Sequence, residues 1–119
     1  MNTTEALDAL AGLAQKTRLA IFRYLVQHGP DGACPGEIGE ALGVAAPTLS
    51  FHLKALLQAG LVDAEQHGRS ITYRADFAAM QALVDYLGDN CCGGDASRCA
   101  PPTPRPARTP AVAAARPAR

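Results

Sequence analysis

The residues best suited to chemistry lie near the C-terminus, where three of the four cysteines fall within nine positions. They are Cys91, Cys92 and Cys99, and Gly93 and Gly94 follow the adjacent pair. Reduced thiolates bind soft metals and metalloids, and neighbouring thiols can be oxidised to disulfides or persulfides. This segment contains no hydrophobic core in which to bury thiols. The cluster therefore predicts metal, metalloid or redox chemistry, and idle cysteines in a flexible tail are the weaker alternative.

The compartment decides whether these thiols stay reduced. The segment 1–5 lacks a basic stretch followed by a long apolar run, so it does not predict a secretory signal. No run of about 18 apolar residues predicts a membrane span. We therefore expect a cytoplasmic protein whose cysteines are reduced. Cys34 lies far from the others in sequence, and we expect it to be a small buried or half-buried residue.

The charge of the chain does not indicate nucleic-acid binding. The 119 residues include eleven basic and eleven acidic side chains. Up to Leu87, acidic residues outnumber basic ones, and DNA binding would therefore need a local basic patch and helix N-termini. The basic residues of this part are Lys16, Arg18, Arg23, Lys54, Arg69 and Arg74.

Hydrophobic periodicity and helix breakers predict the elements that position these residues. Thr4 is the predicted N-cap of the first helix. Gly29-Pro30-Asp31-Gly32 ends the second helix, while Gly43 and Gly60 end the third and fourth. The predicted helices cover residues 4–14, 16–28, 36–42, 47–59 and 77–87, and strands 61–66 and 70–74 flank a tight turn at 67–69.

This order of elements is mainly α with a small β-hairpin, which is the layout of a winged helix-turn-helix. We expect residues 1–89 to form this DNA-binding and dimerisation domain. Residues 90–100 would form a separate cysteine-rich sensing segment. Residues 101–119 are rich in proline, alanine and arginine, and we expect them to be disordered.

The helix predicted at 47–59 has two distinct faces at 100° per residue. Leu49, Leu53, Leu56 and Leu57 fall on one side and would pack inward. The opposite side would be free to enter a major groove. It carries Thr48, Phe51, Lys54 and Ala55, with Ser50 and His52 flanking the leucines.

Six side chains are predicted to contact DNA, and most have a simpler alternative. Thr48 and Ser50 would reach base edges or phosphates. Phe51 would contact a thymine methyl or a sugar, or else pack against a neighbouring element. Lys54 would bind a phosphate, or else be solvated. His52 would contact DNA, or else form a hydrogen bond within the core. Arg69, at the hairpin tip, would bind a phosphate or enter a minor groove, or else be solvated.

Three stretches of the chain resemble the ArsR family of metal-sensing repressors, also called ArsR/SmtB. They are KTRLAIFRYLV (16–26), LSFHLKALLQAGLV (49–62) and HGRSITYR (67–74), within a resemblance that covers about residues 7–87. The resemblance implies a homodimer joined by its first and last helices. It also implies two recognition helices in successive major grooves of operator DNA and repression that a ligand relieves.

The resemblance also allows the inducer sites of the family to be checked one by one. The arsenic site at the third helix is not intact, because Gly36 and Gly39 stand where cysteines would follow Cys34. The zinc site on the last helix is absent, because residues 77–87 contain no histidine. The remaining cysteines after that helix resemble those of the arsenite-responsive subgroup. This implies Cys91, Cys92 and Cys99 as the metalloid ligands.

We therefore expect an arsenite-responsive transcriptional repressor without a permanent cofactor. Its inducer would be As(III), with Sb(III) as a second candidate. It would bind operator DNA as a homodimer and be released when cysteine thiolates capture the metalloid. Cadmium, lead or zinc sensing, thiol-redox or persulfide sensing, and a purely protein-binding winged helix are the alternatives. We do not expect an enzyme, because the sequence lacks paired carboxylates, a phosphate loop and metal-histidine spacing.

Overall fold

The computed structural model describes residues 1–99, so the predicted disordered tail at 101–119 lies outside the described residues. The chain divides into one compact unit of Met1–Leu87 and a second unit that begins at Gly88. We describe each unit by itself. Within residues 1–99, no helix is both long enough and apolar enough to cross a membrane.

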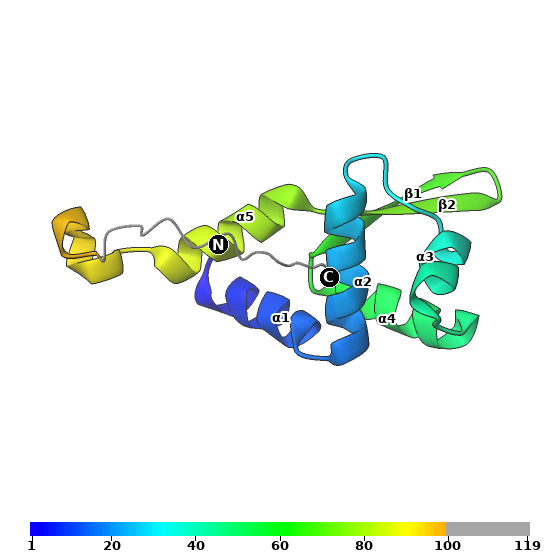
Figure 1. The fold of residues 1–119 in the computed structure, drawn as a ribbon, viewed down its shortest axis with the longest axis horizontal. Coiled ribbons are helices and arrows are strands. Elements are labelled where there is room, and N and C mark those ends of the chain that lie inside the picture. The colour runs from blue at the N-terminus through cyan, green and yellow to red at the C-terminus, as the bar shows by residue number, and fades with distance from the viewer. Residues whose placement is uncertain (100–119) are drawn as a thin grey trace, which may run out of the picture. The chain divides into compact units, whose positions relative to one another are not determined.

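Five helices and one antiparallel hairpin make up the first unit (Figure 1). This confirms the predicted winged helix-turn-helix order, with boundaries that differ by at most one residue. The elements are α1 (Thr3–Leu13), α2 (Lys16–His28), α3 (Pro35–Leu42), α4 (Ala46–Gln58), β1 (Val62–His67), β2 (Ser70–Ala75) and α5 (Phe77–Gly88).

The start of α1 differs from the prediction. The N-cap is Asn2, and Thr4 lies inside the helix. The Asn2 side chain accepts a hydrogen bond from the Glu5 N–H at 2.8 Å, and the Glu5 carboxylate accepts one from the Asn2 N–H at 2.9 Å. This reciprocal capping box satisfies two backbone donors that the helix cannot pair itself. Asn2 and Glu5 have the spacing of this motif, which could have identified the cap.

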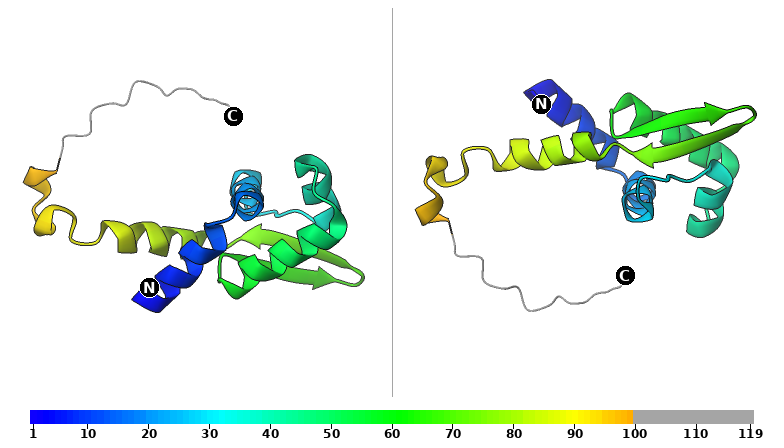
Figure 2. Two further views of the ribbon diagram at one scale, coloured as in Figure 1. Left: turned by 90° about the horizontal axis from the view of Figure 1, so that it is seen from below. Right: turned by 90° about the horizontal axis from the view of Figure 1, so that it is seen from above.

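The hairpin and the α3–α4 pair lie at the same end of the unit (Figures 1 and 2). β1 contacts α4, and β2 contacts α3. The loop before α3 also joins the hairpin, because Ala33 and Tyr73 exchange two backbone hydrogen bonds of 2.8 Å. Gly68 makes the tight turn at a φ of 62°, a conformation that favours glycine. The wing is therefore fixed to the helix-turn-helix by backbone pairing as well as packing.

The core forms where α2, α3, α4 and the start of β1 meet. Leu49, Leu53 and Leu56 are buried as predicted, whereas Leu57 is 36% exposed and lies at the edge of the leucine face. Burying one such side chain contributes about 1.5–3 kcal/mol, so this set accounts for much of the stability of the unit. The largest fully buried side chains are Ile21, Leu25, Ile38, Leu49, Leu53, Leu56 and Leu61.

Helices α1 and α4 approach closely at Gly12. A Cβ atom on Gly12 would lie 2.8 Å from the Cβ of Ala59 and 3.3 Å from a methyl group of Leu61. Contacts between carbon atoms are optimal at about 3.5–4.0 Å, so a side chain would force the two helices apart. Glycine is required here because of this close approach.

We predict that Gly12→Ala destabilises the protein although alanine is the better helix former. The overpacking should cost about 1–3 kcal/mol, against a propensity gain of roughly 1 kcal/mol. Gly36→Ala in α3 is the matched control, because a Cβ there meets nothing within 4 Å. Urea unfolding measures the stability of each variant. The double variant Gly12→Ala/Ala59→Gly should recover part of the lost stability, because it removes the Cβ of Ala59. A Gly12→Ala protein as stable as the unaltered chain would contradict this packing.

Candidate functional site

The first candidate site is the exposed face of α4, which a short turn joins to α3. Gly43 adopts the left-handed conformation, with φ 67° and ψ 36°, and the Val44 N–H bonds to the Gly39 carbonyl at 3.0 Å. No side chain caps α4 at Ala45, although Pro47 stands in its first turn. The first N–H groups of α4 therefore remain available for an anion such as a phosphate.

The four residues that we call the outer face of α4 are Thr48, Ser50, Phe51 and Lys54, and all are exposed. Phe51 is 67% exposed, the largest such fraction among the exposed large apolar side chains of residues 1–99. It therefore does not pack into a neighbouring element of its own unit. The outer face combines hydroxyls, one cation and one aromatic ring, groups that can contact phosphates, base edges and thymine methyls.

His52 lies on the buried side of α4, where it is 7% exposed. Its Nδ1 lies 3.5 Å from Nη1 of Arg18. This placement favours the alternative that we left open, a histidine that hydrogen-bonds inside the unit. The prediction that His52 contacts DNA loses its support, because the side chain is almost fully buried and its Nδ1 lies beside Arg18. We expect His52 to stabilise α4 from its buried side.

Arg18 connects the end of α1 to this buried histidine. Its Nε donates to the Gly12 carbonyl at 2.7 Å, and its Nη2 donates to the Ala11 carbonyl at 3.4 Å. The guanidinium thus satisfies two carbonyls at the C-terminus of α1, where a cation is also favoured by the helix dipole. This role of Arg18 could not be predicted, since nothing in the sequence spacing relates Arg18 to residues 11, 12 and 52.

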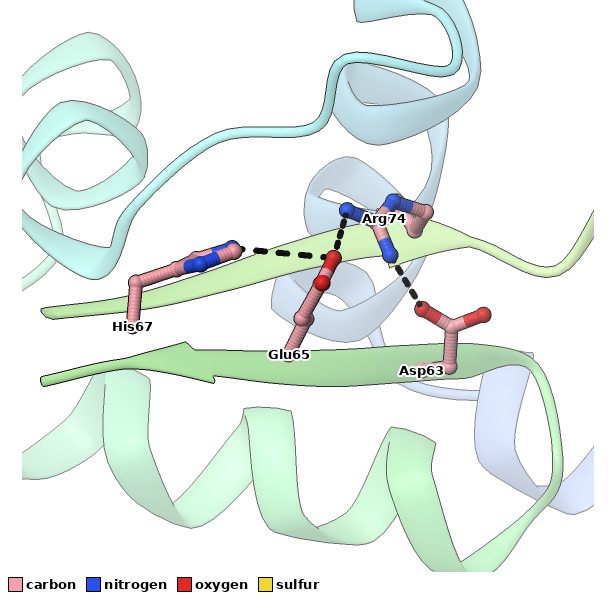
Figure 3. Close-up of polar contacts among 4 residues, drawn as sticks. All are labelled: Asp63, Glu65, His67 and Arg74. Atoms are coloured by element: carbon pink, nitrogen blue, oxygen red, sulfur yellow. Dashed lines mark hydrogen bonds and ion pairs between the residues drawn. The ribbon is translucent and has the colours of Figure 1, made fainter.

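The wing holds most of its charges in pairs (Figure 3). Arg74 on β2 bonds to Glu65 at 2.8 Å and to Asp63 at 3.4 Å, both on β1. His67 lies 3.6 Å from the same Glu65 carboxylate. Within residues 1–99, Arg69 joins none of these ion pairs and is exposed at the turn. It is therefore the cation of the hairpin that remains available for a partner.

These ion pairs shift the pKa values of two side chains in the wing, Glu65 and Arg74. The hydrogen bond from Arg74, followed by the nearby charge of His67, lowers the pKa of the Glu65 carboxyl. The same hydrogen bond raises the pKa of Arg74. Because a lowered carboxyl pKa favours the ionised form, this pairing persists at neutral pH and is lost as the pH falls through the folded-state pKa of Glu65. At neutral pH the wing thus keeps its charges paired below the tip.

The second candidate site is the thiol cluster in the unit that begins at Gly88. The Sγ atoms of Cys91, Cys92 and Cys99 all lie within 4.8 Å of one another. Their separations are 3.8 Å for Cys91 and Cys92, 3.6 Å for Cys91 and Cys99, and 3.2 Å for Cys92 and Cys99. We call this set the thiol triangle.

The thiol triangle has the dimensions of a set of ligands around one soft centre. Sulfur ligands at about 2.3 Å from a tetrahedral centre are separated by about 3.8 Å, and narrower bond angles shorten that separation. The observed sides are equal to or slightly shorter than this. Thiolates select soft centres, so these three residues fit a metalloid or soft metal with little rearrangement.

Cys34 has a different role in the structure. It is the half-buried N-cap residue of α3, and its N–H donates to the Glu37 carboxylate at 3.1 Å. This hydrogen bond lowers the pKa of the Glu37 carboxyl. Gly36 and Gly39 lie on the same helix. The residue therefore has a local structural function at the start of the helix-turn-helix.

Sequence comparisons identify related proteins. The family described as a helix-turn-helix domain matches residues 13–65. The chain is 30% identical over 95 residues to the uncharacterized HTH-type transcriptional regulator YbzH of Bacillus subtilis, covering 70% of this chain and 95% of that protein. It is 40% identical over 86 residues to the HTH-type transcriptional repressor SmtB of Mycobacterium tuberculosis, covering 68% of this chain and 62% of that protein.

Solved structures show the same fold. A Mycobacterium bovis domain, described as a homodimeric winged helix-turn-helix DNA-binding domain of a possible ArsR-family regulator, is 30% identical with a TM-score of 0.58. The match covers 78% of this chain and 86% of that domain. The antimony-specific transcriptional repressor AntR is 27% identical with a TM-score of 0.57, over 71% of this chain and 75% of that one.

We predict that Arg18→Met lowers the free energy of unfolding by about 1–3 kcal/mol, because two helix-end carbonyls lose a charged donor and His52 loses its partner. Arg23→Met is the matched control on the exposed side of α2 and should change stability by less than about 0.5 kcal/mol. Denaturant unfolding measures both. Additive effects of Arg18→Met and His52→Asn would show that the two side chains do not interact.

Proposed function

The chain belongs to the ArsR/SmtB family of helix-turn-helix transcriptional regulators, and on this premise we propose that it is a repressor that trivalent arsenic releases from operator DNA. Its relatives are transcriptional regulators rather than enzymes. The observation that carries the choice of ligand is the thiol triangle, in which all three Sγ atoms lie within 4.8 Å of one another. We place the protein in the cytoplasm, where such thiols stay reduced.

The proposed DNA contacts come from the outer face of α4 and from the tip of the wing. Thr48 and Ser50 reach base edges or phosphates, Phe51 contacts a thymine methyl or sugar, and Lys54 binds a phosphate. Arg69 binds a phosphate or enters a minor groove. The exposure of all five side chains supports this assignment, as does the packing of the leucine face beneath them.

We propose a homodimer joined through α1 and α5, which would present two outer faces at a spacing of about 34 Å. Large apolar side chains on these helices support it: Leu7 is 60% exposed, Val84 57% and Leu87 62%. A hydrogen bond of 2.7 Å between the Thr3 and Tyr86 hydroxyls links α1 to α5 within one protomer. The two helices can therefore form one apolar surface that a second copy would cover.

The proposed inducer is As(III), with Sb(III) as the second candidate. Both are soft centres that bind three thiolates in a pyramid and need no further ligand. A likeness to the antimony-specific repressor AntR supports metalloids as the ligand class. Zinc normally takes four ligands, and within residues 1–99 no carboxylate or imidazole completes the group of three thiols.

The proposed switch begins where the thiol triangle follows α5 in the chain. Capture of the metalloid fixes this segment at the end of a dimer helix and changes how α5 packs in the dimer. The DNA-bound arrangement of the two outer faces is then disfavoured. By linkage, operator DNA must weaken metalloid binding by the same factor.

A redox sensor is the second candidate, because the Cys92 and Cys99 sulfurs are only 3.2 Å apart. An oxidant such as a peroxide would remove two electrons and two protons from this pair and leave a disulfide. Release from DNA would then depend on oxidant and be reversed by a dithiol reductant. Arsenite-driven release in fully reduced protein separates the two functions.

We predict that Lys54→Ala and Arg69→Ala each weaken operator binding and reduce the salt dependence of log K by about one unit per subunit, because each removes a phosphate contact. Phe51→Ala should weaken operator binding with little change in salt slope. Fluorescence anisotropy at several salt concentrations measures these effects. Arg23→Ala, an exposed cation outside the proposed surface, is the control, and equal slopes in all variants would refute the assignment.

We predict that Cys91→Ser and Cys92→Ser each abolish arsenite-driven release while leaving operator affinity in the absence of arsenite within about twofold. Each variant leaves two thiolates in the triangle, which bind a three-coordinate centre poorly. A titration of arsenite against operator-bound, reduced protein measures release. Cys34→Ser is the matched control and should respond like the unaltered chain. Unchanged release in the Cys91 and Cys92 variants would reject the triangle as the sensor.

A further inference from the structure

We propose that Asp95 and Ser97 are positioning residues that hold the thiol triangle together before ligand arrives and favour three-coordinate metalloids over tetrahedral metals. This inference deepens the proposed function and rests on it. It concerns side chains that supply no sulfur ligand. Their role follows from how the chain between Cys92 and Cys99 is turned back on itself.

The first part of the turn needs an unusual backbone. Asn90 and Cys92 have φ values of 57° and 56°, and Gly93 and Gly94 have φ values of 68° and 86°. Glycine adopts this left-handed region readily, but for another L-residue it costs about 1–2 kcal/mol. Cys92 therefore holds a conformation that the rest of the segment must stabilise.

The second part of the turn is built around Asp95. Its Oδ1 accepts hydrogen bonds from the Ser97 N–H at 3.0 Å and from the Ser97 hydroxyl at 2.6 Å. Its backbone N–H donates to the Cys92 carbonyl at 3.2 Å, and its carbonyl accepts from the Arg98 N–H at 3.1 Å. The backbone of Asp95 thus connects the residue before the glycines to the residue that precedes Cys99, and its side chain stabilises this turn through Ser97.

This turn returns Cys99 to the adjacent pair. Without it, the seven-residue separation of Cys92 and Cys99 would have to be closed by the ligand itself. Closing and ordering such a loop reduces the observed affinity, whereas a preformed site avoids this cost. The sulfurs already lie 3.2 and 3.6 Å from Cys99 Sγ, so little of this cost remains when the metalloid binds.

The same contacts bear on the choice of ligand. Zinc normally takes four ligands, and a nearby aspartate oxygen is one group that could complete a set of three thiolates. Here two donors from Ser97 engage one oxygen of the Asp95 carboxylate, and the group of possible metal ligands within residues 1–99 contains the three thiols alone. A pyramidal centre such as As(III) is satisfied by this set. A tetrahedral ion must recruit a water molecule to complete its coordination.

The test uses the full, reduced chain and two probes, arsenite and Cd(II), each followed by sulfur-to-metal charge-transfer absorption. Asp95→Ala and Ser97→Ala should weaken arsenite binding about tenfold or more, as loss of groups that orient ligands commonly does. Asp95→Asn retains an acceptor oxygen and should restore most of the affinity. Asp89→Ala is the matched control, because it removes a nearby carboxylate outside the turn.

The number of thiols that arsenite protects from a thiol reagent distinguishes a positioning role from a general loss of stability. With arsenite bound, the unaltered chain should protect all three thiols of the triangle from a thiol reagent. Asp95→Ala should leave Cys99 reactive while Cys91 and Cys92 stay protected, and its preference for arsenite over Cd(II) should fall. Equal affinity, protection and preference in Asp95→Ala and Asp89→Ala would overturn the positioning role and leave the proposed function intact.

The proposed function fails in a different way. If the unaltered chain binds no arsenite, both the proposed arsenite-responsive function and the proposed selectivity for metalloids are wrong. Cd(II) binding then still reports on the turn, because a triangle held by Asp95 must bind Cd(II) more weakly after Asp95→Ala. The two failures can therefore be told apart in one set of titrations.

Discussion

The close contact between α1 and α4 is the constraint on which the rest of the first unit depends. Gly12 lets the two helices approach. The Arg18 guanidinium stabilises that approach, because its Nε and Nη2 donate to the carbonyls of Gly12 and Ala11 while its Nη1 lies beside His52. The helix proposed to form the dimer and the helix proposed to read DNA therefore share one polar contact. A change in the packing of α1 cannot leave the orientation of α4 untouched, because interiors packed at this density transmit displacement.

Electrostatics places a second demand on the molecule. The first unit carries more acidic than basic residues, so attraction to DNA has to come from a few well-placed groups. The wing shows how this is arranged: Arg74 is held by Glu65 and Asp63, which leaves Arg69 at the tip. Pairing keeps the acidic strand from repelling phosphates as strongly as its composition suggests. Binding would then depend on register and on two subunits more than on general charge.

Much of the fold could be predicted because it rests on local rules. The leucine spacing of α4, the glycine stops and the hairpin turn each act over a few residues, and the structure confirms them except for Leu57, which is exposed. The role of His52 could not be decided, because a residue that flanks an apolar face turns inward or outward according to its partner. That partner, Arg18, lies 34 residues away. The positioning role proposed for Asp95 and Ser97 could not be predicted for a similar reason, since it depends on how the chain turns between Cys92 and Cys99.

The proposed switch and the modest DNA surface fit each other energetically. Allosteric coupling is typically about 1–3 kcal/mol, which changes affinity by roughly 5–150-fold. A strongly basic protein would stay on DNA after such a change, because its non-specific affinity would remain. The first unit has a net acidic balance, so it contributes little non-specific affinity for DNA. In the proposed mechanism, a ligand that only disturbs the alignment of the two outer faces would therefore be sufficient to release the protein from operator DNA.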